Sequence, residues 1–163
     1  MTSSGESFGS TKEGSLTFPK SAGGIRKGDY MLIKGNPCKI LSVTTSKTGK
    51  HGHAKCAITG TDIFTGKKCE DSVPSSHNVE CPNVTKTEYE LVDVGEDNFL
   101  TLMDTESGET REDLKLSDHK NWEEVNNNIL EDFEGLDDNL IIVVTVLKAM
   151  GQECVISHRK VNS

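Results

Sequence analysis

The sequence predicts a mostly β protein made of two small barrels, the second of which contains one helix. Three observations lead to this fold class. Apolar residues fall in short alternating or β-branched runs, with turn residues such as Gly, Pro, Asn and Asp between them. Hydrophobic residues make up 33% and aromatic residues 5% of the 163 residues, which suits small cores better than one large core. Residues 1–84 carry eleven Lys or Arg and seven Asp or Glu, whereas residues 85–163 carry seven and nineteen.

This division of charge favours different surroundings for the two halves. Between Met31 and Cys69 there are seven lysines and a single acid, Asp62. A basic surface of this kind can face phosphates, whose contacts position a protein without reading base sequence. The acidic second half is expected to be repelled by bare nucleic acid. Charge alone fits equally well with two solvated surfaces that share no partner.

The amino-terminal residues predict a tail rather than a folded element. Residues 1–17 are rich in Ser, Gly, Thr and Glu, a composition typical of disordered or loosely attached segments. Ordered structure is expected to begin near Ile25. The first domain is assigned to residues 18–84, and it ends with a polar segment that contains Pro74 and Pro82.

The strands of the first domain follow from β-branched runs between turn residues. The expected strands are Tyr30–Lys34, Cys38–Thr45, Lys55–Thr59 with a continuation at Asp62–Phe64, and Lys67–Asp71. Gly60-Thr61 predicts a bend or bulge before that continuation. Gly35-Asn36-Pro37 and Thr65-Gly66 predict the turns. Short strands at this spacing favour a small barrel over a parallel sheet.

Residues 85–163 form the second predicted domain. The expected strands are Thr87–Val94, Phe99–Met103, Thr110–Leu116, Leu140–Leu147 and Glu153–Ser157. A helix is expected at Asn121–Phe133, because Trp122, Val125, Ile129 and Phe133 recur at spacings of three and four. Three strands, a helix and two more strands match the order of an OB fold. OB barrels often bind single-stranded nucleic acid through basic and aromatic faces, but this half is acidic and poor in aromatics.

The ends of that helix also have sequence signals. Asp118 is expected to cap its start and Gly135 to stop it. The three consecutive asparagines at 126–128 weaken the prediction, because Asn has a poor helix propensity.

The stretch from Thr45 to Phe64 is the most distinctive part of the chain. Gly49 and Gly52 lie three residues apart among polar and basic residues, and Gly can adopt positive φ at little steric cost. Both flanks read as strands. The pattern therefore predicts a hairpin whose tip holds Lys50 outward.

Lys50 has three interpretations. An ordinary exposed lysine would be one solvated charge among many. A catalytic amine would need burial or neighbouring cations to lower its pKa, and a glycine-flanked tip offers little burial. A modification site needs exposure, flexibility and a distinctive neighbourhood, all of which the sequence offers.

The residues of this loop resemble those of the eukaryotic translation initiation factor 5A family. The similar segments are TSKTGKHGHAK at residues 45–55, DIFTGKK at 62–68, KGNPCKI at 34–40, the Glu70-Asp71, Pro74-Ser75, His77-Asn78 and Pro82-Asn83-Val84 positions, and REDLKL at 111–116. The similarity covers most of the chain from about Phe18. It implies an SH3-like β-barrel followed by an OB barrel. It also implies that Lys50 is converted to hypusine.

The resemblance implies a non-enzymatic translation factor that binds the ribosome through rRNA and peptidyl-tRNA. Deoxyhypusine synthase and deoxyhypusine hydroxylase would modify Lys50 with the aminobutyl group of spermidine, and no other cofactor is implied. The modified side chain would reach the acceptor end of peptidyl-tRNA and relieve stalls such as those at consecutive prolines. The residues expected to present it are Lys47, Thr48, Gly49, His51, Gly52 and His53. The candidate RNA contacts are Lys47, Lys50, Lys55, Lys67 and Lys68.

Two other function classes compete with this interpretation. A general RNA-binding module would bind with an affinity that falls with salt and does not depend on lysine modification. An enzyme would use the His and Cys residues. His51, His53 and Cys56 include zinc-type ligands, but no fourth ligand appears at a usual spacing, so no metal site is predicted. The acids between Glu131 and Asp138 suggest a solvated surface, since no nucleophile accompanies them.

The cysteines and the amino-terminal residues indicate the cellular compartment in which the protein is expected. The five cysteines are odd in number and include no C-x-x-C unit, which favours reduced, mostly buried thiols over a disulfide framework. The sequence has no bilayer-length apolar run and no secretion-signal pattern, so the cytoplasm is the expected location and no membrane partner is expected. The sequence leaves the oligomeric state open, a dimer included.

Overall fold

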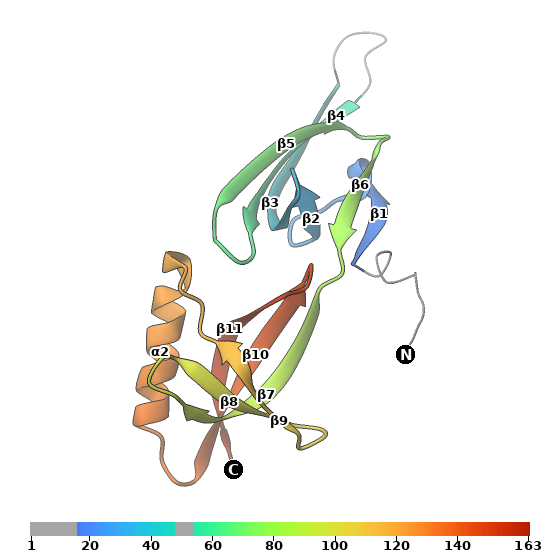
Figure 1. Ribbon diagram of the computed structural model, residues 1–163. Helices are drawn as coiled ribbons and strands as arrows, with labels where there is room; N and C mark the ends of the chain where they lie inside the picture. Colours follow the sequence, from blue (N-terminus) through green and yellow to red (C-terminus); the bar gives the residue numbers. More distant parts are fainter. Residues whose placement is uncertain (1–15, 48–53) are drawn as a thin grey trace. The chain divides into compact units, whose positions relative to one another are not determined.

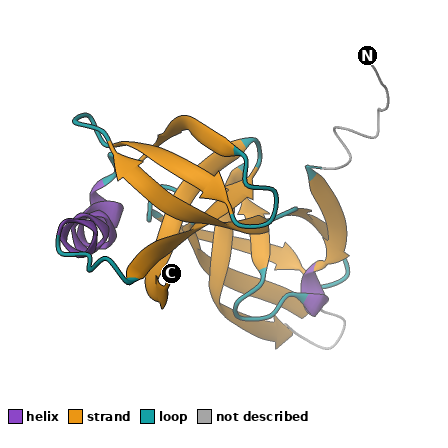
Figure 2. Cartoon of the chain, turned by 90° about the horizontal axis from the view of Figure 1, so that it is seen from below, coloured by secondary structure: helices purple, strands orange, loops and turns teal. Residues whose placement is uncertain are grey.

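The computed structural model describes residues 16–47 and 54–163, and strands dominate both parts of the chain (Figures 1 and 2). The chain divides into two compact units: residues 1–84 with Ala149–Gly151 form the first, and Thr85–Lys148 with Gln152–Ser163 form the second. Each unit has its own buried apolar cluster. The prediction of a mostly β protein with one α-helix is confirmed for the described residues. None of the helices in these ranges is long and apolar enough to span a membrane.

The first unit contains a four-stranded antiparallel sheet and a separate strand pair. The sheet has the order β2-β3-β4-β5, formed by Tyr30–Ile33, Asn36–Lys47, Ala54–Asp62 and Lys68–Pro74. The pair consists of β1 (Thr17–Ser21) and β6 (Asn78–Pro82), and a short 3-10 helix, η1 (Ala22–Gly24), follows β1. The core of this unit is made of Ala22, Ile25, Met31, Ile33, Cys38, Ile40, Cys56, Ile58 and Cys81.

The expected start of ordered structure near Ile25 is wrong, because β1 begins at Thr17. β1 pairs with β6 from Thr17 opposite Pro82 to Ser21 opposite Asn78, and neither strand was predicted. The prediction of a disordered tail otherwise falls on residues 1–15, which lie outside the described residues. Both strands contain proline, which sheets tolerate at their edges, so the local pattern does not indicate a strand. Their partner lies about sixty residues away in sequence, and only the folded chain brings the two together.

The irregularity expected at Gly60-Thr61 lies mainly on the opposite strand. The β3–β4 register shifts between Ile40 and Ser42, so Leu41 is the extra residue facing Gly60. A Cβ on Gly60 would lie 2.9 Å from the Lys39 carbonyl oxygen and 3.1 Å from the Cys38 Cβ. Glycine therefore allows the two backbones to approach each other at the bulge.

The expected strand continuation through Phe64 is also wrong, because β4 ends at Asp62 and a turn follows. The Asp62 carboxylate oxygen Oδ1 accepts backbone N–H groups from Phe64 at 2.8 Å and Thr65 at 3.0 Å. The Gly66 N–H donates to the Asp62 carbonyl at 2.9 Å, and Gly66 has φ +77°. An Asp side chain that binds the backbone two residues on stabilises a turn, and this competes with the strand pattern.

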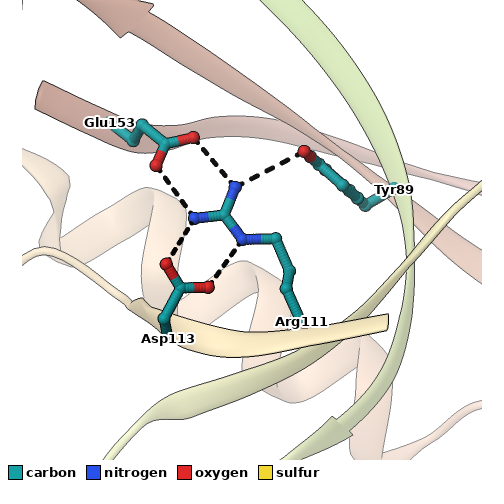
Figure 3. Close-up of polar contacts among 4 residues, drawn as sticks. All are labelled: Tyr89, Arg111, Asp113 and Glu153. Carbon is teal, nitrogen blue, oxygen red and sulfur yellow. Dashed lines mark hydrogen bonds and ion pairs between the residues drawn. The ribbon is translucent and has the colours of Figure 1, made fainter. Parts of the chain in front are cut away.

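The second unit is a five-stranded antiparallel sheet with one α-helix (Figure 1). The strand order is β11-β10-β7-β8-β9, formed by Gln152–Asn162, Leu140–Ala149, Thr85–Val94, Phe99–Asp104 and Thr110–Lys115. All five predicted strands are therefore present. The buried cluster includes Leu91, Leu100, Leu102, Ile129, Ile142, Val144 and Val146. Arg111 of β9 and Glu153 of β11 connect the first and last strands of this order (Figure 3).

The helix α2 spans Glu123–Glu134 and follows a short 3-10 helix, η2 (Lys120–Trp122). Ile129 is fully buried, and Val125 and Phe133 pack against the same cluster, so the predicted apolar face is confirmed. Gly135 is the residue at which the helix stops, as predicted. The predicted cap at Asp118 is wrong: Trp122 precedes the helix without a side-chain cap, and Asp118 pairs with Lys115 at 3.6 Å.

Candidate functional site: the hairpin that carries the lysine loop

The β3–β4 hairpin extends beyond the core of the first unit. Its ladder runs from Cys38 opposite Asp62 to Lys47 opposite Ala54. Cys38 and Ile40 are buried, whereas the four residues from Thr44 to Lys47 are all exposed. On β4 the core reaches Cys56, which pairs with Thr45. Two further pairs, Ser46 with Lys55 and Lys47 with Ala54, extend beyond it, which corresponds to about 7 Å of strand.

The predicted lysine loop is the connection between these two strands. Because Lys47 pairs with Ala54, the six residues Thr48, Gly49, Lys50, His51, Gly52 and His53 join the two ends of the ladder. All six lie outside the described residues. The expected hairpin is confirmed in its two strands. The predicted outward position of Lys50 stays a prediction.

The β4 arm of the hairpin is anchored by backbone contacts. The Ser75 N–H donates to the Ala54 carbonyl at 2.9 Å, directly after the loop. The Ser75 carbonyl in turn accepts the Gly23 N–H at 2.9 Å and the Ser21 hydroxyl at 3.0 Å. The buried Cys56 thiol lies 3.8 Å from the Ala22 carbonyl oxygen. The end of β1, η1 and the turn after β5 thus brace the strand that leaves the loop.

The lysines beside the loop point to opposite faces of the hairpin. Residues paired across two strands share a face, so Lys55 lies with Ser46 and Lys47 lies with Ala54. The Thr45 hydroxyl approaches the buried Cys56 thiol at 3.8 Å, which places the Thr45 and Lys47 side of β3 toward the core side of the sheet. Lys55 lies on the outer side. The hairpin therefore carries a positive charge on each face near its end.

The other two predicted RNA contacts lie at the far end of β4 from the loop. Lys68 pairs with Thr61, six residues along the strand from Lys55, which corresponds to about 20 Å. Lys68 shares the outer face with Lys55, and Lys67 lies in the preceding turn. Lys67 and Lys68 are exposed, and the Lys68 ammonium lies 4.0 Å from Glu70. The four predicted lysines that the structure describes thus form no single cluster.

Lys39 belongs to the same outer face and was not predicted. It pairs with Thr61 on one side of β4, while Lys68 pairs with Thr61 on the other. Its neighbours Cys38 and Ile40 are buried and Lys39 is exposed. The alternation of apolar and polar residues in Cys38-Lys39-Ile40 was the signal that could have found it. We call Lys39, Lys55 and Lys68 the outer lysine row.

The only acid between Met31 and Cys69 does not offset this row. Asp62 is 8% exposed, and its carboxylate is occupied by the turn that it caps. The exposed Glu70 of β5 pairs with Thr59, so it shares the outer face and offsets part of the charge of Lys68. Three lysines against this one acid leave the face positive, and a positive face attracts phosphate oxygens.

The cysteines are poorly suited to nucleophilic chemistry. All five are free thiols, and all except the half-buried Cys69 are buried. Burial raises the pKa of Cys38 to about 12 and that of Cys154 to about 11, so both stay protonated at neutral pH. The expectation of mostly buried thiols is confirmed. In residues 16–47 and 54–163 no group of three His, Cys, Asp or Glu side chains could hold a metal ion; His51 and His53 lie outside these ranges.

Family models match both units of the chain. Residues 15–77 match the model described as translation initiation factor 5A-like, N-terminal. Residues 83–159 match the model described as eukaryotic elongation factor 5A hypusine, DNA-binding OB fold. Eukaryotic translation initiation factor 5A-2 of Solanum lycopersicum is 50% identical over 139 residues, which cover 85% of this chain and 82% of the relative. The chain belongs to the eukaryotic translation initiation factor 5A family.

Further relatives and solved structures agree with this assignment. Eukaryotic translation initiation factor 5A-3 of Arabidopsis thaliana is 47% identical over 148 residues, which cover 90% of this chain and 89% of the relative. The structure of a translation initiation factor eIF-5A family protein from Naegleria fowleri ATCC 30863 superposes with a TM-score of 0.79 at 46% identity, over 89% of this chain and 99% of that chain. The structure of eukaryotic translation initiation factor 5A from Methanococcus jannaschii superposes with a TM-score of 0.66 at 29% identity, over 88% of this chain and 95% of that chain.

The family assignment confirms two predictions. The fold class, an SH3-like barrel followed by an OB barrel with one helix, agrees with the solved relatives. The chain is a member of a family of translation factors that is associated with hypusine.

Proposed function

We propose that this protein is a ribosome-binding translation factor whose Lys50 carries hypusine. The modified side chain reaches the acceptor end of peptidyl-tRNA and promotes peptide-bond formation at stalled sequences such as polyproline, in elongation and in termination. Deoxyhypusine synthase and deoxyhypusine hydroxylase install the modification from spermidine in the cytoplasm. The protein supplies no reaction centre of its own.

The observation that carries this proposal is the place of the motif in the fold. TSKTGKHGHAK begins and ends in the two strands of a hairpin whose last two residue pairs extend about 7 Å past the buried Cys56. Next to the loop, the β4 arm is held by contacts of Ala54 with Ser75 and of Cys56 with Ala22. Strands that are braced next to the loop suit the presentation of Lys50 in a narrow space, because these strands need little ordering on binding.

The chemistry of hypusine explains why a plain lysine is insufficient. Transfer of the aminobutyl group to the Lys50 nitrogen roughly doubles the length of the side chain. The original nitrogen remains a charged secondary amine, and the new terminal amine adds a second positive charge. The hydroxyl group adds one donor and acceptor. Such an arm can pass between the phosphates of folded RNA and hold the tRNA end in a reactive geometry.

The charges beside the loop support entry between RNA surfaces. Lys47 and Lys55 lie on opposite faces of the hairpin, so phosphates on either side meet a positive charge. The outer lysine row continues this attraction for about 20 Å along β4. These contacts would position the domain and leave the specific action to Lys50.

Substitution of the modified residue tests the proposal. Lys50→Arg keeps the charge of an unmodified lysine but cannot accept the aminobutyl group. In cells depleted of the native factor, Lys50→Arg is expected to fold and to fail to restore synthesis of a polyproline reporter. Lys47→Arg is the matched control, because it changes a neighbouring lysine of the same hairpin and leaves the modified position intact.

Full reporter synthesis with Lys50→Arg would overturn the proposal. The alternative, a general RNA-binding module that does not depend on modification, would then be the better account. That module predicts ribosome binding that weakens with salt equally for the parent chain and Lys50→Arg.

A further inference from the structure

The second unit exposes two large apolar side chains on one face of its sheet. Val92 in β7 is 45% exposed and Phe99 in β8 is 42% exposed. They are the exposed large apolar residues among the described residues of this unit. Isolated apolar residues on a surface are common, so the arrangement around them decides whether they form a site.

A β-bulge turns two consecutive residues of β7 outward. Leu91 pairs with Leu102 and Asp93 pairs with Thr101, so Val92 is an extra residue. Leu91 and Val94 both pack into the core of the unit. Since both flanking residues point inward, Val92 and Asp93 must both face solvent.

A second β-bulge, in β9, places two consecutive residues opposite Thr101 on the other side of β8. Leu100 pairs with Leu114 and Leu102 with Arg111, which leaves Glu112 and Asp113 opposite Thr101 alone. The Thr101 hydroxyl donates to the Glu112 carboxylate at 3.4 Å, so this carboxylate lies on the outer side of the sheet. We call Val92, Asp93, Phe99, Thr101 and Glu112 the double-bulge face.

The Phe99 ring of this face makes a cation–π contact with Lys115 of the same unit. The Lys115 ammonium lies 6.0 Å from the centre of the Phe99 ring, and it also pairs with the exposed Asp118 at 3.6 Å. Lys115 and Phe99 are directly opposite each other in the β8–β9 ladder. The Phe99 ring therefore already interacts with one cation, and cation–π contact is a known mode of recognition for Lys and Arg.

The residues around the double-bulge face are mostly acidic, which favours a positively charged partner. Residues 85–163 carry nineteen acids and seven basic residues. Asp93 and Glu112 flank the centre of the double-bulge face, and Glu90 is the next outward residue of β7. RNA phosphates would be repelled by these carboxylates, whereas a chain rich in Lys and Arg would be attracted.

We propose that the double-bulge face docks a basic protein segment that carries Lys or Arg next to an apolar or aromatic side chain. The apolar group covers Val92 and Phe99, and the cations pair with Asp93 and Glu112. The site does not use Lys50 or the hairpin, and it goes beyond the proposed action on peptidyl-tRNA.

Chemical-shift titration of the full-length, nitrogen-15-labelled chain tests this inference. The probe is a synthetic peptide in which arginine and leucine alternate with glycine. Amide shifts are expected to concentrate in β7, β8 and β9. Phe99→Ala is expected to weaken binding by about tenfold, because aromatic anchors dominate small interfaces. Phe18→Ala is the control, since Phe18 is 44% exposed and lies in the first unit.

A second pair of variants separates charge from apolar contact. The double variant Asp93→Asn with Glu112→Gln keeps the shape of both side chains. It is expected to remove most of the salt dependence of the peptide affinity. The control Asp137→Asn with Asp138→Asn neutralises two exposed acids between α2 and β10, and it is expected to leave the peptide affinity and its salt dependence unchanged.

Two results would overturn the inference. The first is a peptide titration without shifts on β7–β9, or with shifts that persist in Phe99→Ala. The second is a titration in which an oligouridylate RNA shifts these strands and the peptide does not, which would make the face a nucleic-acid surface.

Discussion

Arg111 donates hydrogen bonds from both of its terminal nitrogens to Glu153, at 2.9 Å from Nη1 and 2.8 Å from Nη2 (Figure 3). The same guanidinium donates to Asp113 through Nε at 2.7 Å and reaches the Tyr89 hydroxyl at 3.4 Å. Arg111 and Glu153 lie on β9 and β11, the two ends of the strand order in the second unit. Their bidentate pair therefore fastens together the first and last strands of the sheet.

Removal of this guanidinium should destabilise the second unit. Arg111→Met leaves the Glu153 carboxylate half-buried without its main partner, and the free energy of unfolding is expected to fall by about 2 kcal/mol, less than for a fully buried pair. Urea unfolding followed by the fluorescence of Trp122, the single tryptophan, reports on this unit. Arg159→Met is the matched control, because Arg159 donates two hydrogen bonds to Glu88 at a more exposed position. Its free energy of unfolding is expected to fall by less than about 1 kcal/mol. Equal losses would contradict the special role of Arg111.

The same pair predicts a pH dependence. The hydrogen bonds from Arg111 lower the pKa of Glu153 from its ordinary value of 4.5. A carboxyl with a lowered pKa in the folded state stabilises the fold above its unfolded pKa and loses that contribution as the pH falls through the folded value. Glu153→Gln should therefore be less stable than the parent chain at neutral pH, and the difference should shrink as the pH falls below 4.5. A difference that is constant across this range would show that the charge of Glu153 is not involved.

The bulge opposite Gly60 should tolerate no side chain. Gly60→Ala places a Cβ 2.9 Å from the Lys39 carbonyl oxygen, and a loss of about 1–3 kcal/mol in the first unit is expected from such overpacking. Hydrogen exchange at the buried amides of Ile40 and Ile58 measures this loss. Gly24→Ala is the control, because its Cβ would meet only the flexible end of Lys20 at 3.6 Å. Unchanged protection in Gly60→Ala would contradict the close approach of the two strands.

The outer lysine row should strengthen ribosome binding through its charge. Replacing Lys39, Lys55 or Lys68 by Gln is expected to weaken binding. The slope of log affinity against log salt should fall by about 1 for each phosphate that the variant no longer neutralises. Lys120→Gln is the control, since Lys120 is an exposed lysine of the acidic unit. A salt slope that stays the same in all three variants would exclude this row from the RNA interface.

The strands with strong local patterns were predictable from the sequence, and the long-range pairings were not. Leu140–Leu147 is an apolar β-branched run and forms most of β10. In contrast, β1 and β6 are short strands that contain proline, and their pairing depends on residues far apart in sequence. The helix start was misplaced because Asp118 resembles a cap, whereas its carboxylate pairs with Lys115.

The two strands that flank the lysine loop were predictable from composition and periodicity, whereas the arrangement of the lysines on them was predictable only in part. Which lysines share a face depends on register, and the bulge at Leu41 changes the register in the middle of the hairpin. The exposure of Lys39 follows from local alternation, but the face that it shares with Lys55 depends on this register, as does the placement of Lys47 and Lys55 on opposite faces.

Mass spectrometry of the peptide that contains Lys50, taken from protein isolated from its own organism, tests the central claim most directly. The account predicts a 4-amino-2-hydroxybutyl group on the Lys50 nitrogen. An unmodified Lys50 at full occupancy would contradict it and leave salt-dependent RNA binding by the lysine-rich unit as the remaining explanation.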